Sequence, residues 1–209
     1  MEKLKEKSEY DGNPVGLSKD TATKMASELD RHLASLITLY NQYHKHHWVV
    51  EGPQFRDLHL FLEEHYTEVH EQYDAIAERL TVMGYCPTCH PARQLELTYI
   101  QHEEEGVFRI REMLQKDMED EKQIVVELRK SIKLAFQHDD FATKALLEGI
   151  LLKTEDRCHH IEHFLGEDSL SIGLTTKPED ILEEDTQAAP GKKAPLRAGT
   201  KKAATKTKA

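Results

Sequence analysis

The sequence has no apolar run long enough to cross a membrane. None of its hydrophobic stretches approaches the roughly 20 residues that a spanning helix needs, and no secretory signal pattern opens it. Its 3 cysteines are too few for a disulfide framework. These absences predict a cytoplasmic protein with reduced thiols and no membrane partner.

Positive charge is scarce as well. Across 209 residues, 28 Lys and Arg stand against 38 Asp and Glu, so the formal net charge is −10. With 38% hydrophobic residues and a mean hydropathy of −0.65, the chain can form one core under a highly charged surface. The overall acidity argues against a simple nucleic-acid-binding domain.

Helical periodicity dominates the middle of the chain, and no strand pattern competes with it. Apolar residues recur at intervals of three and four over four long segments. These segments run from an N-cap at Ser18 to about Val50, and over about Phe55–Met83, Val107–Gln137 and Asp140–Leu165. A short helix is expected near Gln94–Ile100. This layout predicts an all-α fold, a ferritin-like four-helix bundle with a short extra helix between its second and third helices.

The ends of the chain differ in composition from the bundle, which is expected over residues 18–166. Residues 1–17 mix charges with Gly, Asn and Pro and predict a flexible N-terminal arm. Residues 167–190 predict an acidic linker. Residues 191–209 form a basic, low-complexity tail that holds too little apolar surface to fold.

Two histidines and three carboxylates have the spacing of metal ligands. His47 closes the first helix, and the second helix carries His59 and Glu63 one turn apart and Asp74 and Glu78 one turn apart. Helical rotation places both pairs on one broad face, but about 22 Å apart along the axis, too far for one ion. Two copies of the helix packed antiparallel would bring the pairs together twice. The spacing therefore predicts a dimer with two metal sites between subunits and with Val69 close to the two-fold axis.

The types of these side chains suggest which metal they bind. Imidazole and carboxylate without thiolate suit iron, manganese or zinc. His70, one turn before Asp74, is a candidate extra ligand that would favour zinc. The alternative is a solvated acidic face with surface histidines. No Glu-x-x-His occurs in the chain, and Asp156 with His159 is the nearest imitation, which argues against a di-iron site inside the bundle.

The residues around these ligands resemble the signature of the Dps family, the DNA-binding proteins from starved cells, also called miniferritins. The matching residues are His47-Trp48, Glu51-Gly52, Phe55, Leu58-His59 and DAIAER at 74–79, and the resemblance covers roughly residues 18 to 166. In that family a second histidine follows the first by twelve residues, an aspartate comes four later, and an Asp-x-x-x-Glu pair lies further along the helix. The chain departs from this pattern at Glu63, where the family usually has aspartate.

The resemblance implies a hollow shell of twelve identical subunits. Its members oxidise ferrous iron at subunit interfaces, preferably with hydrogen peroxide, and store ferric mineral inside. Carried over to this chain, the catalytic metal ligands would be His47, His59 and Glu63 of one subunit with Asp74 and Glu78 of its partner. Trp48 would shield or orient the site. By family analogy alone, Asp139 and Asp140 would line an iron entry pore.

The basic tail suggests contact with DNA. Removing its seven cations from the 28 Lys and Arg leaves 21 against 38 acids, so the rest of the chain carries −17. Weak, sequence-independent phosphate binding by such a tail gains avidity when it is repeated around an oligomer. The expected DNA-binding residues are Lys192, Lys193, Arg197, Lys201, Lys202, Lys206 and Lys208. A tail that only improves solubility is the alternative.

These features leave three functions open. The first is a nucleoid-associated miniferritin that consumes iron and peroxide. The second is a nucleoid-compacting DNA-binding protein with secondary metal chemistry, and the third is a zinc-holding buffer without oxidase activity.

Two further motifs have no assigned role. The sequence Cys86-Pro87-Thr88-Cys89-His90 matches a c-type haem attachment pattern, but an ordinary loop, a redox pair or a zinc site fits it as well. His159, His160 and His163 cluster near the end of the fourth long helix. A surface location is expected for them, with an auxiliary metal site as the alternative.

Overall fold

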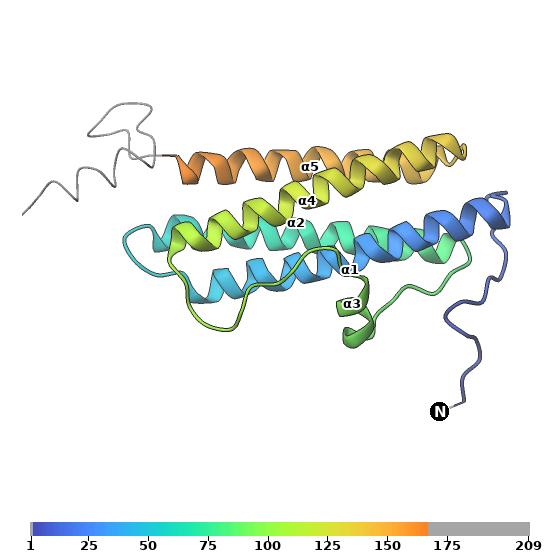
Figure 1. The fold of residues 1–209 in the computed structure, drawn as a ribbon, viewed down its shortest axis with the longest axis horizontal. Coiled ribbons are helices and arrows are strands. Elements are labelled where there is room, and N and C mark those ends of the chain that lie inside the picture. Colours follow the sequence, from blue (N-terminus) through green and yellow to red (C-terminus); the bar gives the residue numbers. More distant parts are fainter. Residues whose placement is uncertain (1, 167–209) are drawn as a thin grey trace, which may run out of the picture. The chain divides into compact units, whose positions relative to one another are not determined.

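Five helices and no strand make up the part of the chain described by this computed structural model, residues 2–166. They are α1 (Lys19–Val49), α2 (Phe55–Val82), α3 (Pro91–Leu97), α4 (Ile110–Gln137) and α5 (Phe141–Leu165) (Figure 1). The predicted all-α class is confirmed. The predicted linker and basic tail lie outside the described residues. None of the helices within 2–166 is both long and apolar enough to span a membrane.

Local signals explain where most helices begin and end. Ser18 caps α1, its hydroxyl accepting the Thr21 amide at 3.1 Å, as its sequence position predicts. Gly84 follows α2 with a φ of +85°, and a Cβ there would lie 2.1 Å from the Gly12 carbonyl oxygen, so a side chain would clash with the N-terminal arm. Residues 2–17 form no helix.

Two helices begin at residues other than those predicted from the sequence, and each shift has a local cause. The short helix α3 starts at Pro91 rather than near Gln94, because proline fits the first turn, where its missing N–H costs nothing. Helix α4 starts at Ile110 rather than Val107. There the Glu112 carboxylate accepts the backbone N–H of Arg109 at 3.4 Å, as an acid at the third helical position commonly does.

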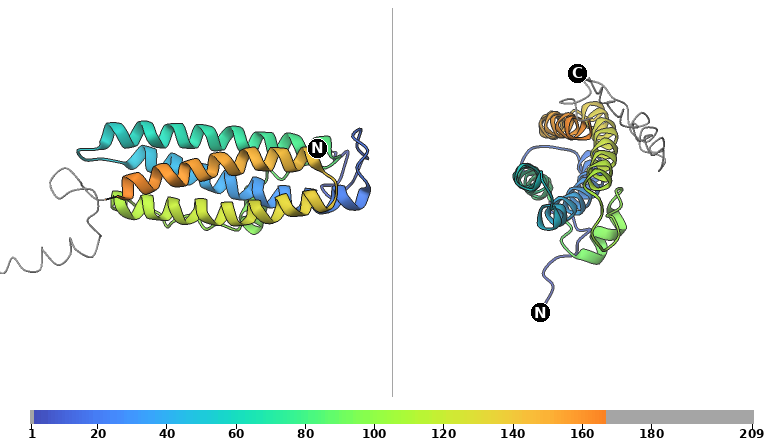
Figure 2. Two further views of the ribbon diagram at one scale, coloured as in Figure 1. Left: turned by 90° about the horizontal axis from the view of Figure 1, so that it is seen from above. Right: turned by 90° about the vertical axis from the view of Figure 1, so that its left-hand side faces the viewer.

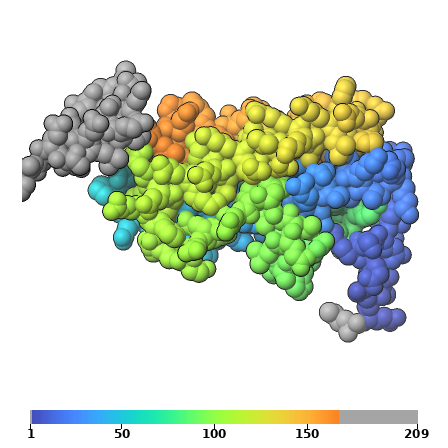
Figure 3. Space-filling model, in the orientation of Figure 1, coloured from blue at the N-terminus to red at the C-terminus, as the bar shows by residue number. Residues whose placement is uncertain are grey.

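The long helices pair as two antiparallel hairpins, α1 with α2 and α4 with α5, and the hairpins pack together (Figures 1 and 2). The connection between α2 and α4 runs outside the bundle and carries α3 against α1, where it protrudes from the surface (Figure 3). Inward-facing apolar residues of the four long helices fill the core, among them Leu29, Leu36, Leu62, Ile76, Ile124, Leu128, Leu147 and Ile161.

Buried His46 of α1 contacts the connection between α2 and α4 close to the start of α4. The His46 ring lies 2.9 Å from Asp117 Oδ2 on α4 and 2.9 Å from Glu103 Oε1 on the connection. Burial alone would lower the pKa of His46, but the two carboxylates outweigh it and raise the pKa above its ordinary value. Lys45 also pairs with Glu103, so the connection is held beside α1.

The centre of the bundle is polar and is organised by Arg157 of α5. Its side chain is 2% exposed. The guanidinium donates to Glu68 on α2 at 2.7 Å and to both carboxylate oxygens of Glu121 on α4. Tyr43 of α1 donates to Glu121 at 2.7 Å. One cation therefore links all four long helices, and these partners raise the pKa of Arg157 although burial opposes the charge.

We expect Arg157→Met to lower the free energy of unfolding by about 3–5 kcal/mol, because it leaves the Glu121 carboxylate buried without a counter-charge. Lys153→Met is the matched control, since Lys153 is 56% exposed and also approaches Glu68, at 3.3 Å. The control should cost less than about 1 kcal/mol. Urea unfolding at one fixed protein concentration measures both variants. Equal losses would show that the buried network is not the main contributor.

Candidate metal site

His47 at the end of α1 and His59 at the start of α2 lie against each other. Their rings stack with centroids 3.6 Å apart and planes 20° apart. The break between the two helices makes this possible, because Gly52 adopts a φ of +104° and Pro53 prevents α1 from continuing. Sequence spacing predicts both residues as ligands, and the structure brings them together.

Reciprocal hydrogen bonds fix how these two imidazoles can act. Nδ1 of His47 lies 2.9 Å from the carbonyl oxygen of His59, and Nδ1 of His59 lies 2.9 Å from the carbonyl oxygen of His47. A carbonyl oxygen only accepts, so each Nδ1 carries the proton and each Nε2 keeps its lone pair. Metal-binding histidines are commonly oriented in this way. The pair is thus prepared to bind a metal through two Nε2 atoms.

The carboxylates do not join the histidines within one chain. Glu63, Asp74 and Glu78 are all exposed along α2, as is His70. Among residues 2–166, no group of three or more His, Cys, Asp or Glu side chains could hold a metal ion. A single chain therefore presents the histidines at one end of α2 and the Asp74–Glu78 pair near the other. The shared site between two chains stays a prediction.

An aromatic cluster borders the histidine pair. The His44 ring lies between Trp48, at 4.3 Å, and Tyr66, at 4.5 Å, and Tyr66 is also 5.3 Å from His47. Burial and then the charge of Glu63 raise the pKa of Tyr66. Sequence reasoning placed Trp48 beside the site but missed His44 and Tyr66. Their offsets of three residues from His47 and Glu63 were the available signal.

The middle of α2 shows which residues are available at a two-fold axis. The side chain of Val69, predicted to lie close to the axis, is fully buried in its own bundle, and its distance from an axis stays a prediction. Thr67 and His70 are the exposed residues beside it. The His70 ring packs 4.9 Å from Tyr73 and 6.1 Å from Tyr40, so aromatic rings lie on one side of it.

The pore prediction is wrong for Asp140. This side chain is 1% exposed, accepts from Arg79 at 2.8 Å, and caps α5 by accepting the Thr143 amide at 3.1 Å. A carboxylate used in this way cannot line a channel. Asp139 is exposed and has a φ of +56°, at the turn between α4 and α5.

The sequence raised two other places for a metal or haem, the Cys-x-x-Cys-His loop and the inside of the bundle. In the loop that holds the Cys-x-x-Cys-His pattern, Cys86 and Cys89 are free and exposed. Thr88 between them is buried and bonds Asp30 through its amide at 2.9 Å and its hydroxyl at 2.6 Å, which anchors the loop to α1. Inside the bundle, the Glu68 and Glu121 carboxylates are paired with Arg157.

Comparison with known proteins supports one family. The family model described as a ferritin-like domain matches residues 26–171. A nutrient stress-induced DNA-binding protein of Synechococcus is 42% identical over 165 residues, 79% of this chain and 94% of that protein. A DNA protection during starvation protein of Halobacterium salinarum is 39% identical over 72% of this chain and 83% of its own length.

Solved structures agree with these sequence matches. The crystal structure of an archaeal Dps homologue from Halobacterium salinarum superposes with a TM-score of 0.78 at 36% identity, covering 81% of this chain and 95% of its own. DpsC from Streptomyces coelicolor gives 0.79 at 27% identity, covering 81% and 99%. The ferritin-like arrangement predicted from the helix layout is confirmed.

Proposed function

This chain belongs to the Dps family of ferritin-like proteins, and we propose that it oxidises ferrous iron at sites shared between two subunits. The observation that carries the proposal is the His47–His59 pair, with both Nε2 atoms left free by reciprocal backbone hydrogen bonds. We further propose a hollow shell of twelve copies that stores the ferric product. Its place would be the cytoplasm, in association with the nucleoid.

Antiparallel pairing of two α2 helices completes the ligand set. A pairing centred between Thr67 and His70 places Glu63 opposite Asp74 of the partner copy, and places His59 opposite its Glu78. The same register serves both ends of the helix pair, so two sites form. His70 would sit near the axis, 1 turn from Asp74. In this register it is a neighbour of the metal ligands rather than one of them.

Ferrous iron and hydrogen peroxide are the proposed substrates. Each peroxide takes two electrons and two protons to give two waters, and each ferrous ion supplies one electron. Two ferrous ions bound close together therefore reduce peroxide completely, without release of a hydroxyl radical. The mixed imidazole and carboxylate ligands suit iron, and zinc is a possible competitor at the same position.

Replacing the histidine pair tests the site. The variant His47→Ala/His59→Ala should slow peroxide-driven iron oxidation by more than about tenfold, because loss of even the partners of metal ligands costs 10–100-fold. The measurement is anaerobic loading with ferrous iron, then peroxide, followed by absorbance of the ferric product. A control variant, His90→Ala/His138→Ala, removes two histidines of the connecting segments and should keep the parental rate.

Two results would contradict the assignment. Oxidation at the parental rate by the His47/His59 variant would place the site elsewhere. Tight zinc binding by the parent without any iron oxidation would favour a zinc-holding protein. Size-exclusion chromatography of each variant separates loss of the site from loss of assembly.

A cross-link tests the subunit pairing. In the proposed register Thr67 of one copy faces His70 of the other, so Thr67→Cys/His70→Cys should form a disulfide-linked dimer under mild oxidation. The three native cysteines are first replaced by serine. Non-reducing electrophoresis detects the product. A chain with the single exposed change Lys153→Cys on α5 should stay monomeric on the gel, and equal cross-linking by both would exclude this register.

We propose that DNA contacts come from the tail, residues 191–209, which lies outside the described residues. Two similar proteins carry DNA binding or DNA protection in their names. The rest of this chain carries −17, so it repels the phosphate backbone. The seven tail cations are the largest unbroken block of positive charge, and their binding would not depend on sequence.

Deleting residues 191–209 should abolish most DNA retention and leave iron oxidation unchanged. Retention of random duplex DNA by the full chain should fall steeply with salt, because each neutralised phosphate releases condensed counterions. Gel-shift titration of both proteins across a salt series measures this. Equal retention by both would move the contact to the N-terminal arm, with Lys3, Lys5 and Lys7. Failure of the full chain to bind at low salt would leave the tail a solubilising role.

A further inference from the structure

The last turns of α5 carry a second pair of facing histidines. His159 and His163 are one turn apart and therefore lie on the same face of the helix. Their rings are exposed, with centroids 4.4 Å apart and planes at 72°. The two Nε2 atoms are 3.1 Å apart. This pair lies on a different helix from every residue of the proposed iron site.

The distance between these nitrogens suits a shared ion. Zinc binds imidazole nitrogen at about 2.0–2.1 Å, so two ligands at angles between square and tetrahedral lie about 2.9–3.4 Å apart. A separation of 3.1 Å falls within that range. A direct hydrogen bond between one protonated and one bare nitrogen gives the same distance, and the two alternatives require different tautomers.

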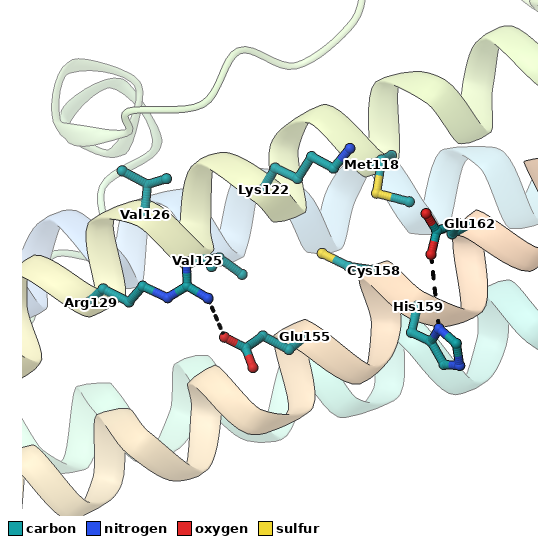
Figure 4. Close-up of a pocket in the computed structure, with 9 residues that line it drawn as sticks. All are labelled: Met118, Lys122, Val125, Val126, Arg129, Glu155, Cys158, His159 and Glu162. Carbon is teal, nitrogen blue, oxygen red and sulfur yellow. Dashed lines mark hydrogen bonds and ion pairs between the residues drawn. The ribbon is translucent and has the colours of Figure 1, made fainter.

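Glu162 favours the tautomer that a metal needs. Its carboxylate oxygen lies 4.0 Å from Nδ1 of His159 (Figure 4), whereas His163 contacts Nε2 of the same ring. The carboxylate is not hydrogen-bonded at this distance, but it lies nearest the Nδ1 edge, and a closer approach would let it accept the Nδ1 proton and leave Nε2 of His159 with its lone pair. A carboxylate in this position orients many metal-binding histidines. The sequence His-x-x-Glu-His on a helix also holds zinc in one class of metallopeptidases.

Nearby side chains do not add a third ligand. His159 and Glu162 border a groove of about 520 Å³ between α4 and α5 (Figure 4). In it, Glu155 is engaged by Arg129 at 2.7 Å. Among residues 2–166, no third His, Cys, Asp or Glu side chain is placed to complete a metal-binding group with the pair. The remaining coordination positions are therefore open to water.

We propose that His159 and His163 bind a late first-row divalent cation of the zinc, nickel and copper class, with Glu162 as the residue that positions His159. Two imidazoles without a directly bound carboxylate favour these ions over ferrous iron, which lies lower in the affinity order. With two protein ligands the site is exchangeable, and it binds a metal without forming a hydrolytic centre. This inference does not depend on the proposed iron chemistry.

Equilibrium dialysis of the full chain against Ni²⁺ tests the proposal. His159→Gln and His163→Gln should each remove one Ni²⁺ per chain from the tightly bound fraction, with an affinity at least about tenfold lower. His160→Gln is the matched control, because it removes the exposed histidine between them without touching the pair. Its Ni²⁺ binding should equal that of the parent.

Spectroscopy identifies the ligands independently. The measurement is made in the His47→Ala/His59→Ala background, because that pair would also bind Cu²⁺ through two imidazoles. There, Cu²⁺ bound in a one-to-one ratio should show hyperfine coupling to two imidazole nitrogens in its electron paramagnetic resonance spectrum, and to one when His159→Gln or His163→Gln is added. If all three glutamine variants bind Ni²⁺ like the parent, the pair is a hydrogen-bonded histidine pair only and the proposal fails. It fails equally if His160→Gln lowers binding as much as the other two.

Discussion

The arrangement of the four long helices depends on one buried guanidinium, that of Arg157. A charge taken out of water must be paired and fully hydrogen-bonded, so Arg157 requires Glu68 and Glu121 to face it across the bundle. Through Tyr43 the same network reaches α1. The Glu68 and Glu121 carboxylates are thereby paired with a protein cation. The candidate metal ligands His47 and His59 lie instead nearer the surface, where the end of α1 and the start of α2 bring them together.

The surface pair depends on local geometry alone. Two helices that meet at a glycine–proline break exchange hydrogen bonds between ring and carbonyl, which orients both imidazoles before any metal arrives. Preorganised ligands of this kind bind without a further ordering cost. The carboxylate half of the proposed site lies far along α2, so under the proposal a complete site would require a second copy of the chain. Site formation and assembly would then be the same event.

Sequence reasoning succeeds here where the signals are local. The helix periods, the Ser18 cap and the glycine after α2 depend on neighbouring residues, and the structure has them as predicted. The Arg157–Glu121 pair joins positions 36 apart, and the bond between His46 and Asp117 spans 71. No periodicity encodes such pairings. Asp140 was misread for the same reason, since its partner Arg79 is 61 residues away. The spacing of His47 and His59 predicts their proximity but not the bonds between them.

The proposed pairing of two α2 helices would bring acidic side chains face to face. In that register Glu63 of one copy faces Asp74 of the other, and like charges placed opposite each other are unfavourable. A metal cation between them turns repulsion into attraction, and so does a shared proton. Ferrous iron would therefore be a substrate that also relieves the strain of the empty interface. The surrounding acids of α2, including Glu64 and Glu71, draw cations to this face and repel DNA from it. Under the proposed function, iron and DNA would therefore be bound by opposite charges on separate parts of one chain.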